Sequence, residues 1–164
     1  KTGKVGVLAT PATFQGALYA SVVERFGAGV ELFQHTCPGL VSQIEKGDLN
    51  SNATRAILED ALHPMLEKNI DTVVLGCTHY PFVIPLIEKI VGENVRVIDP
   101  APSVAKQAKR LLEAQGTKSQ LQGRASVRFF TSGDPSEMKS MLPVLLGESG
   151  EVESVIWKND REVI

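Results

Sequence analysis

The sequence has few cysteines, few aromatic residues and no excess of charge of either sign. Only 2 of its 164 residues are cysteine and 5% are aromatic, while 17 Lys and Arg stand against 19 Asp and Glu. Two cysteines cannot build the disulfide framework of a small secreted domain. The net charge of −2 lacks the basic footprint of proteins that bind nucleic acids or anionic membranes, so we expect neither partner.

Long apolar runs and a secretory segment are also missing. No stretch of the sequence approaches the roughly 18 consecutive apolar residues of a membrane span, and the N-terminus shows no apolar signal region. Because 43% of the residues are hydrophobic, the chain can still bury a core. We therefore expect a globular cytoplasmic protein with reduced thiols.

Apolar strand patterns alternate with helical patterns along most of the chain. Strands are expected at Lys4–Ala9, Val30–Phe33, Val73–Leu75 and Val95–Ile98. Such alternation is typical of an α/β fold, a three-layer sandwich with a mainly parallel sheet. The polar, glycine-containing segment 115–124 has the composition of a linker, which predicts a domain over residues 1–115 and a tail over residues 116–164.

The chain concentrates its reactive side chains at residues 72–81. An apolar run stops at Gly76 and is followed by the thiol of Cys77, the hydroxyl of Thr78 and the imidazole of His79. Ligands in open α/β folds collect at the carboxyl ends of strands, and the helical pattern that follows would favour an anion such as a thiolate. Cys77 could instead be a buried, inert cysteine. The polar cluster beside it favours the reactive interpretation.

Two hydroxyls, those of Thr10 and Thr13, follow the first expected strand. Either threonine could be the N-cap of the next helix, which is the commonest role for threonine at such a position. The alternative is that both hydroxyls face the same crevice as Cys77, because the carboxyl ends of parallel strands lie at one edge of a sheet.

A zinc site is a further possibility for the cysteines and histidines. Cys37 and Cys77, with His35 and His79, supply the donors of a two-Cys, two-His site. The sequence has no Cys-x-x-Cys pair and does not match the usual spacing of structural zinc sites. We therefore expect no metal.

The segment Gly76-Cys77-Thr78-His79-Tyr80-Pro81 resembles the second-cysteine signature of glutamate racemases, within the cofactor-independent aspartate/glutamate racemase superfamily. Residues 9–13 resemble the paired-threonine loop of that family. Residues 37–47 resemble its Cys-Pro-x-x-Val-x-x-x-Glu-x-Gly region. The resemblance covers nearly the whole chain but only about the second half of the family's enzymes.

The resemblance implies a reaction that interconverts L- and D-glutamate without a cofactor. Two acid/base groups on opposite sides of the Cα atom are then required, and Cys77 would be one of them. His79 would tune that side of the site. The residues that would bind the substrate are Thr10, Thr13 and Thr78. Glu45 matches a glutamate that lies near the catalytic histidine in the family, and Cys37 is expected to be structural.

The family's first half carries an Asp-Ser-Gly motif and an Ala-Cys-Asn-Thr motif with the opposing cysteine, and neither string occurs here. The chain also opens at Lys1 rather than at methionine. We therefore expect a C-terminal fragment that holds one of two half-sites and is inactive alone. Residues 1–115 would form one of two pseudo-equivalent racemase domains, and residues 116–164 would complete the missing first domain. Its partners would be that N-terminal half or a second copy in a homodimer.

Two other functions stay open at this point. One is a non-catalytic ligand-binding or interaction domain of the same fold. The other is a related racemase that acts on aspartate or hydantoins. For a glutamate racemase, the resemblance implies a supply of D-glutamate for peptidoglycan.

Overall fold

The computed structural model describes residues 2–119, 126–158 and 162–163. They belong to two compact units, of which the first takes in residues 1–44 and 48–118 and the second residues 45–47 and 119–164. Part of the expected linker, residues 120–125, lies outside the described residues. The domain boundary expected at residue 115 stays a prediction.

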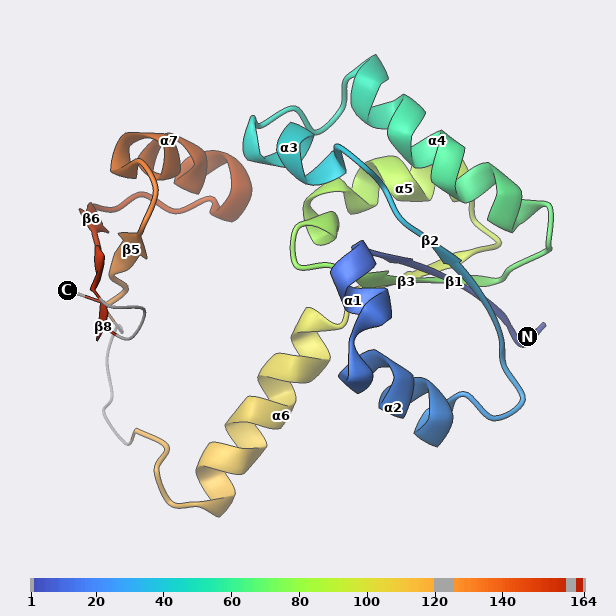
Figure 1. The fold of residues 1–164 in the computed structure, drawn as a ribbon, viewed down its shortest axis with the longest axis horizontal. Helices are drawn as coiled ribbons and strands as arrows, with labels where there is room; N and C mark the ends of the chain where they lie inside the picture. The colour runs from blue at the N-terminus through green and yellow to red at the C-terminus, as the bar shows by residue number, and fades with distance from the viewer. Residues whose placement is uncertain (1, 120–125, 159–161, 164) are drawn as a thin grey trace. The chain divides into compact units, whose positions relative to one another are not determined.

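The first unit is built on a parallel sheet of four strands in the order β2-β1-β3-β4. The strands are β1 (Lys4–Ala9), β2 (Glu31–His35), β3 (Thr72–Gly76) and β4 (Arg96–Ile98). The helices are α1 (Pro11–Gln15), α2 (Ala17–Phe26), α3 (Leu40–Glu45), α4 (Asn52–Leu66), the 3-10 helix η1 (Tyr80–Val83), α5 (Ile84–Val91) and α6 (Ala101–Ala114). Helices α4 and α5 lie on one side of the sheet and α1 and α2 on the other (Figure 1). The predicted α/β fold with a mainly parallel sheet is confirmed.

The centre of one face of the sheet is completely buried under α4 and α5. Leu8 and Leu75 are partners in the β1–β3 register, and neither has any exposed area. Gly6 lies on the same face, where a Cβ atom would come within 2.7 Å of the Met65 sulfur. The helix therefore approaches the sheet closely at this glycine, and apolar burial on this face is the main source of the unit's stability.

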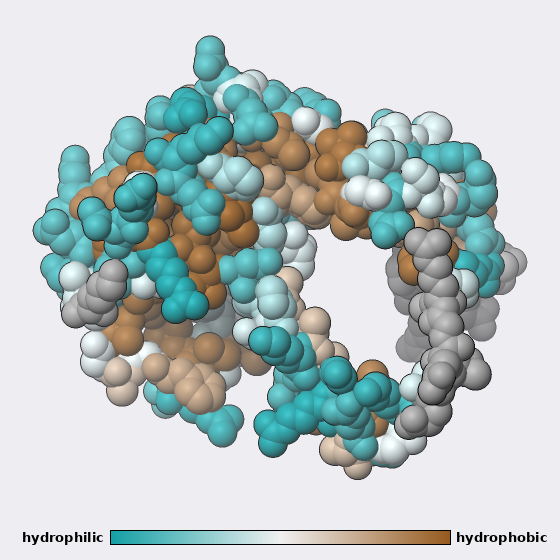
Figure 2. All heavy atoms as spheres, turned by 180° about the vertical axis from the view of Figure 1, so that it is seen from behind, coloured by the Kyte–Doolittle hydropathy of each residue, from teal (hydrophilic) through white to brown (hydrophobic). Residues whose placement is uncertain are grey.

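The helices of the other side keep large apolar side chains in solvent. Leu18 and Phe26 of α2 are 78% and 69% exposed, and Val104 of α6 is 64% exposed. Hydrophobic surface, drawn in brown, interrupts the hydrophilic surface in Figure 2. Exposed apolar residues of this kind are typical of surfaces that another polypeptide covers.

Two helix starts of the first unit have side-chain partners for their main-chain N–H groups. Ser51 is the N-cap of α4, and its Oγ accepts the main-chain N–H of Thr54 at 3.2 Å. Helix α6 begins at Ala101, before the serine at position 103. The Asp99 carboxylate accepts the Ala101 N–H at 2.8 Å and so satisfies one of the N–H groups that have no partner within the helix.

The second unit has its own strand-helix-strand motif. Strand β5 (Phe129–Thr131) pairs in parallel with β6 (Val152–Ser154), and α7 (Pro135–Leu146) connects them. Asp134 is the N-cap of α7, since its carboxylate accepts the Ser136 N–H at 2.7 Å. Strands β7 (Trp157–Lys158) and β8 (Glu162–Val163) form an antiparallel pair. In the described part of the chain, no helix has the length and apolar character needed to cross a membrane.

Candidate active site

The strand order creates a topological switch point between β1 and β3. The chain leaves β1 toward β2 on one side, and β3 then lies on the other side of β1. The connections after these two strands run to opposite faces of the sheet, through α1 and α2 in one case and α5 in the other (Figure 1). In open α/β sheets, ligands bind in the crevice that such a divergence opens at the carboxyl ends of the strands.

The register brings the two expected halves of the site to this crevice. Ala9 at the end of β1 is the partner of Gly76 at the end of β3. A Cβ atom on Gly76 would lie only 2.9 Å from the Cβ atom of Ala9, so glycine permits the close approach of the two strand ends. Thr10 and Cys77 therefore leave the sheet side by side, at the same level.

The two predicted threonines form a linked pair. The hydroxyls of Thr10 and Thr13 are 3.0 Å apart, and Thr10 is also the N-cap of α1. The Thr13 hydroxyl donates to the carbonyl of Gly76 at 3.5 Å, which joins the β1–α1 junction to the end of β3. Thr10 therefore has the N-cap role that one interpretation gave it, and a crevice shared by both hydroxyls and Cys77 stays a prediction.

Cys77, Thr78 and His79 lie in the turn that follows β3. Cys77 and His79 are half-buried and Thr78 is exposed. The turn is closed by the main-chain N–H of Tyr80, which donates to the Cys77 carbonyl at 3.3 Å. A thiol, a hydroxyl and an imidazole thus share one short turn at the edge of the crevice.

The helix expected directly after this turn begins later than the sequence suggested. The 3-10 helix η1 comes first, and α5 starts only at Ile84. Pro85 explains the delay, because proline has no N–H to donate to the carbonyl four residues earlier and is tolerated only in the first turn of an α-helix. The Cys77 turn therefore borders a 3-10 helix rather than an α-helix N-terminus.

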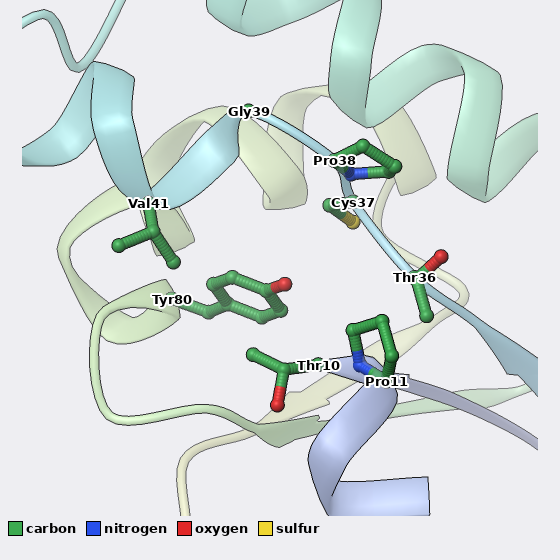
Figure 3. Close-up of a pocket in the computed structure, with 8 residues that line it drawn as sticks. All are labelled: Thr10, Pro11, Thr36, Cys37, Pro38, Gly39, Val41 and Tyr80. Atoms are coloured by element: carbon green, nitrogen blue, oxygen red, sulfur yellow. The ribbon is translucent and has the colours of Figure 1, made fainter.

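A cavity of about 220 Å³ lies beside the turn, and nothing in the sequence indicated that Tyr80 of the Gly76–Pro81 motif would line it. Tyr80 is 1% exposed, and its ring lies among Thr10, Cys37 and Val41, which also line the cavity (Figure 3). The hydroxyl end of the ring is directed toward Cys37. A tyrosine inside a strand-end motif is a signal for such a role, since a buried tyrosine hydroxyl usually requires a partner.

The buried cysteine and tyrosine are both kept neutral. Burial raises the pKa of the Cys37 thiol to about 12, although its hydrogen bond with Tyr80 offsets part of this effect. Burial also raises the pKa of the Tyr80 hydroxyl, and negative charge on Cys37 or Cys77 would raise it further. A thiol that stays protonated at neutral pH is a poor base, so Cys37 is suited to a structural role.

Glu45 is exposed, ends α3, and is grouped with the second unit. Its role near the histidine stays a prediction. Within residues 2–119, 126–158 and 162–163, the structure contains no group of three or more His, Cys, Asp or Glu side chains able to hold a metal ion.

The arrangement is suited to moving a proton at a carbon atom next to a carboxylate. Cys77 provides a group that can take or give a proton, and His79 in the same turn can polarise that exchange. Hydroxyl groups of Thr10, Thr13 and Thr78 are donors of the kind that bind carboxylates. The structure places Thr10 and Thr13 after β1 and Cys77, Thr78 and His79 after the neighbouring strand β3, and the roles of these five residues stay a prediction.

Comparison with known proteins gives a consistent family. Residues 1–108 match the family model described as Asp/Glu/Hydantoin racemase. Over 152 residues the chain is 45% identical to a glutamate racemase of Pseudomonas paraeruginosa, an alignment that covers 93% of this chain and 57% of the relative.

Solved structures show the same similarity. A glutamate racemase isoform from Bacillus anthracis matches with a TM-score of 0.84 and 30% identity, covering 95% of this chain and 58% of that one. The glutamate racemase of Francisella tularensis, solved in complex with D-glutamate, matches with a TM-score of 0.83 and 27% identity, covering 96% of this chain and 59% of that one. The chain therefore spans less than two thirds of the length of these relatives.

Proposed function

This chain belongs to the Asp/Glu/hydantoin racemase family, and we propose that it carries one of the two half-sites of a glutamate racemase. The observation that supports this most directly is the strand-end crevice. There, the turn with Cys77 and His79 follows β3, and the Thr10–Thr13 pair follows β1 and bonds to the carbonyl before Cys77.

The proposed reaction is proton transfer at the Cα atom of glutamate without a cofactor. Cys77 as a thiolate removes the Cα proton of one enantiomer. As a thiol it returns a proton to the same face in the reverse direction. His79 polarises this exchange, and Glu45 supports the histidine. The geometry of proton abstraction requires the substrate to lie against the crevice edge.

The hydroxyls around the crevice hold the substrate. We assign the α-carboxylate to the hydroxyl or N–H of Thr78, with Thr10 and Thr13 completing the pocket on this side. Donors placed at a carboxylate also stabilise the negative charge that develops when the Cα proton leaves. This is the second contribution that racemisation needs from the protein.

The opposing acid/base group lies, in this proposal, outside the 164 residues. Racemisation requires a proton to return from the opposite face, and the chain's other thiol, Cys37, is buried and has a pKa of about 12. The chain spans about 57% of the Pseudomonas relative. The exposed apolar residues of α2 and α6 fit a surface covered by the rest of such a protein, or by a second copy.

Glutamate is the substrate we favour because the similar proteins named above are glutamate racemases and one was solved with D-glutamate. The product D-glutamate would then serve peptidoglycan synthesis in the cytoplasm. Aspartate is the alternative substrate to test, since the family model spans aspartate, glutamate and hydantoin racemases.

Exchange of the Cα proton in D2O, followed by proton NMR, tests the proposal with L- and D-glutamate. We expect exchange by this chain joined to its upstream half and none by residues 1–164 alone. Cys77→Ala should lower the exchange rate about 10²- to 10⁴-fold, the usual contribution of one acid/base group. His79→Asn should also lower it. His63→Asn is the matched control, because His63 is exposed on α4 and should leave the rate unchanged.

Each other outcome would redirect the assignment. Exchange with aspartate but not with glutamate would overturn the substrate. No exchange with either amino acid, combined with saturable binding of glutamate, would favour a non-catalytic binding domain. Full exchange by Cys77→Ala would contradict the role given to this thiol.

A further inference from the structure

Three loops of the first unit meet at the side chain of Tyr80. The β1–α1 junction contributes Thr10, and the loop between β2 and α3 contributes Cys37; both line the same cavity as Tyr80 (Figure 3). The third loop is the turn after β3, which Tyr80 closes through its N–H bond to the Cys77 carbonyl. Tyr80 therefore lies where the β1–α1 junction, the β2–α3 loop and the turn after β3 come together (Figure 3).

The polar end of Tyr80 is held by Cys37. Because Tyr80 is 1% exposed, its hydroxyl depends on a protein partner rather than on bulk water. Its hydroxyl is directed toward Cys37 (Figure 3), and hydrogen bonding between Tyr80 and Cys37 influences the pKa of both side chains. The Cys37 loop is itself fixed, since its carbonyl accepts the N–H of Leu40 at 3.1 Å as α3 begins. The pair thus links the Cys77 turn to a well-anchored loop.

We propose that Tyr80 is a positioning residue, which is held by Cys37 and fixes the main chain of the turn that presents Cys77 and His79. The inference rests on the proposed function only in assigning that turn to catalysis. Cys37 contributes as the partner of Tyr80, not as an acid or base. Burial of the Tyr80 ring fixes the position of the turn, and the pairing of its hydroxyl with the Cys37 thiol lowers the frequency with which the turn opens.

The rate at which iodoacetamide alkylates Cys77, measured by peptide mass spectrometry, tests the proposal without any substrate. Tyr80→Phe keeps the ring and removes the hydroxyl, and Cys37→Ala removes the partner thiol. We expect each variant to raise the Cys77 rate about fivefold, because losing one hydrogen bond allows the turn to open more often. The double variant should show no further increase, since both changes remove the same bond.

Conservative and matched variants separate this role from general destabilisation. Cys37→Ser retains a hydroxyl partner and should restore the rate to within about twofold of the parent, as expected when the hydrogen bond is kept. Tyr19→Phe alters the only other tyrosine, on α2, and should leave the rate unchanged. Circular dichroism identifies any variant that fails to fold; if Tyr80→Phe fails, the Cys37→Ala and Cys37→Ser pair decides.

An unchanged Cys77 rate in folded Tyr80→Phe or Cys37→Ala would overturn the proposal, as would strictly additive effects in the double variant. Alkylation does not require racemase activity. Failure of the Cα exchange experiment would therefore leave this test valid, and failure of this test would leave the racemase proposal standing.

Discussion

Raising the pH should destabilise the first unit through Cys37. Only 5% of this residue is exposed, and burial raises the pKa of its thiol from 9.0 to about 12. Above the ordinary pKa the unfolded chain has lost the thiol proton while the folded chain keeps it. The folded state then binds more protons, so the free energy of unfolding falls as the pH rises toward the folded pKa. The loss is about 1.4 kcal/mol between about pH 8 and pH 10.

Urea unfolding followed by circular dichroism, with a reducing agent present, measures this loss. Cys37→Ser is the matched control, because serine does not titrate in this range and can still pair with Tyr80. Between about pH 8 and pH 10, the free energy of unfolding of the parent should fall by about 1.4 kcal/mol more than that of Cys37→Ser. A difference that stays constant over this range would refute the reasoning, since Cys37 would then ionise alike in both states.

Two further predictions concern the strand end and a helix start. Gly76→Ala adds a methyl group 2.9 Å from the Ala9 Cβ, and we expect the free energy of unfolding to fall by about 1 to 3 kcal/mol as the strands are forced apart; an unchanged urea midpoint would contradict this close approach. Ser51→Ala removes the N-cap bond of α4 and should cost about 1 kcal/mol, whereas Ser103→Ala, at a position inside α6 rather than at its N-cap, should cost clearly less by the same measurement. Equal losses would contradict the capping role of Ser51.

The sheet, and the positions of the candidate site residues at its strand ends, could be predicted because their signals are local. An apolar run such as Val73–Leu75 that ends at a glycine predicts a buried parallel strand, and the polar residues after it must lie at the strand's carboxyl end. The same logic applies to Thr10 after β1. Once the two strands are parallel neighbours, the two short segments have to meet, whatever the details of the helices.

The remaining features depend on contacts between distant parts of the chain. Nothing in the sequence near Tyr80 identifies Cys37 as its partner, since the two residues come together only when the β2–α3 loop packs against the turn after β3. The start of α6 is a feature of another kind. Serine is a residue type that favours helix N-caps, yet α6 begins before Ser103, because Asp99 and the proline in the first turn allow an earlier start.

The need for an opposing half follows, within the proposed function, from the one-sided arrangement of the site. The candidate residues of the first unit occupy the ends of β1 and β3, which lie at a single edge of one sheet. A Cα atom bound against that edge is reached by Cys77 from one side only, whereas inversion requires proton delivery from the other. Cys37 cannot supply it, because it is held in the interior by Tyr80 and keeps its proton at neutral pH. The second acid/base group must therefore approach from a surface facing the crevice, and for that reason the decisive comparison is between residues 1–164 alone and the same residues joined to their upstream half.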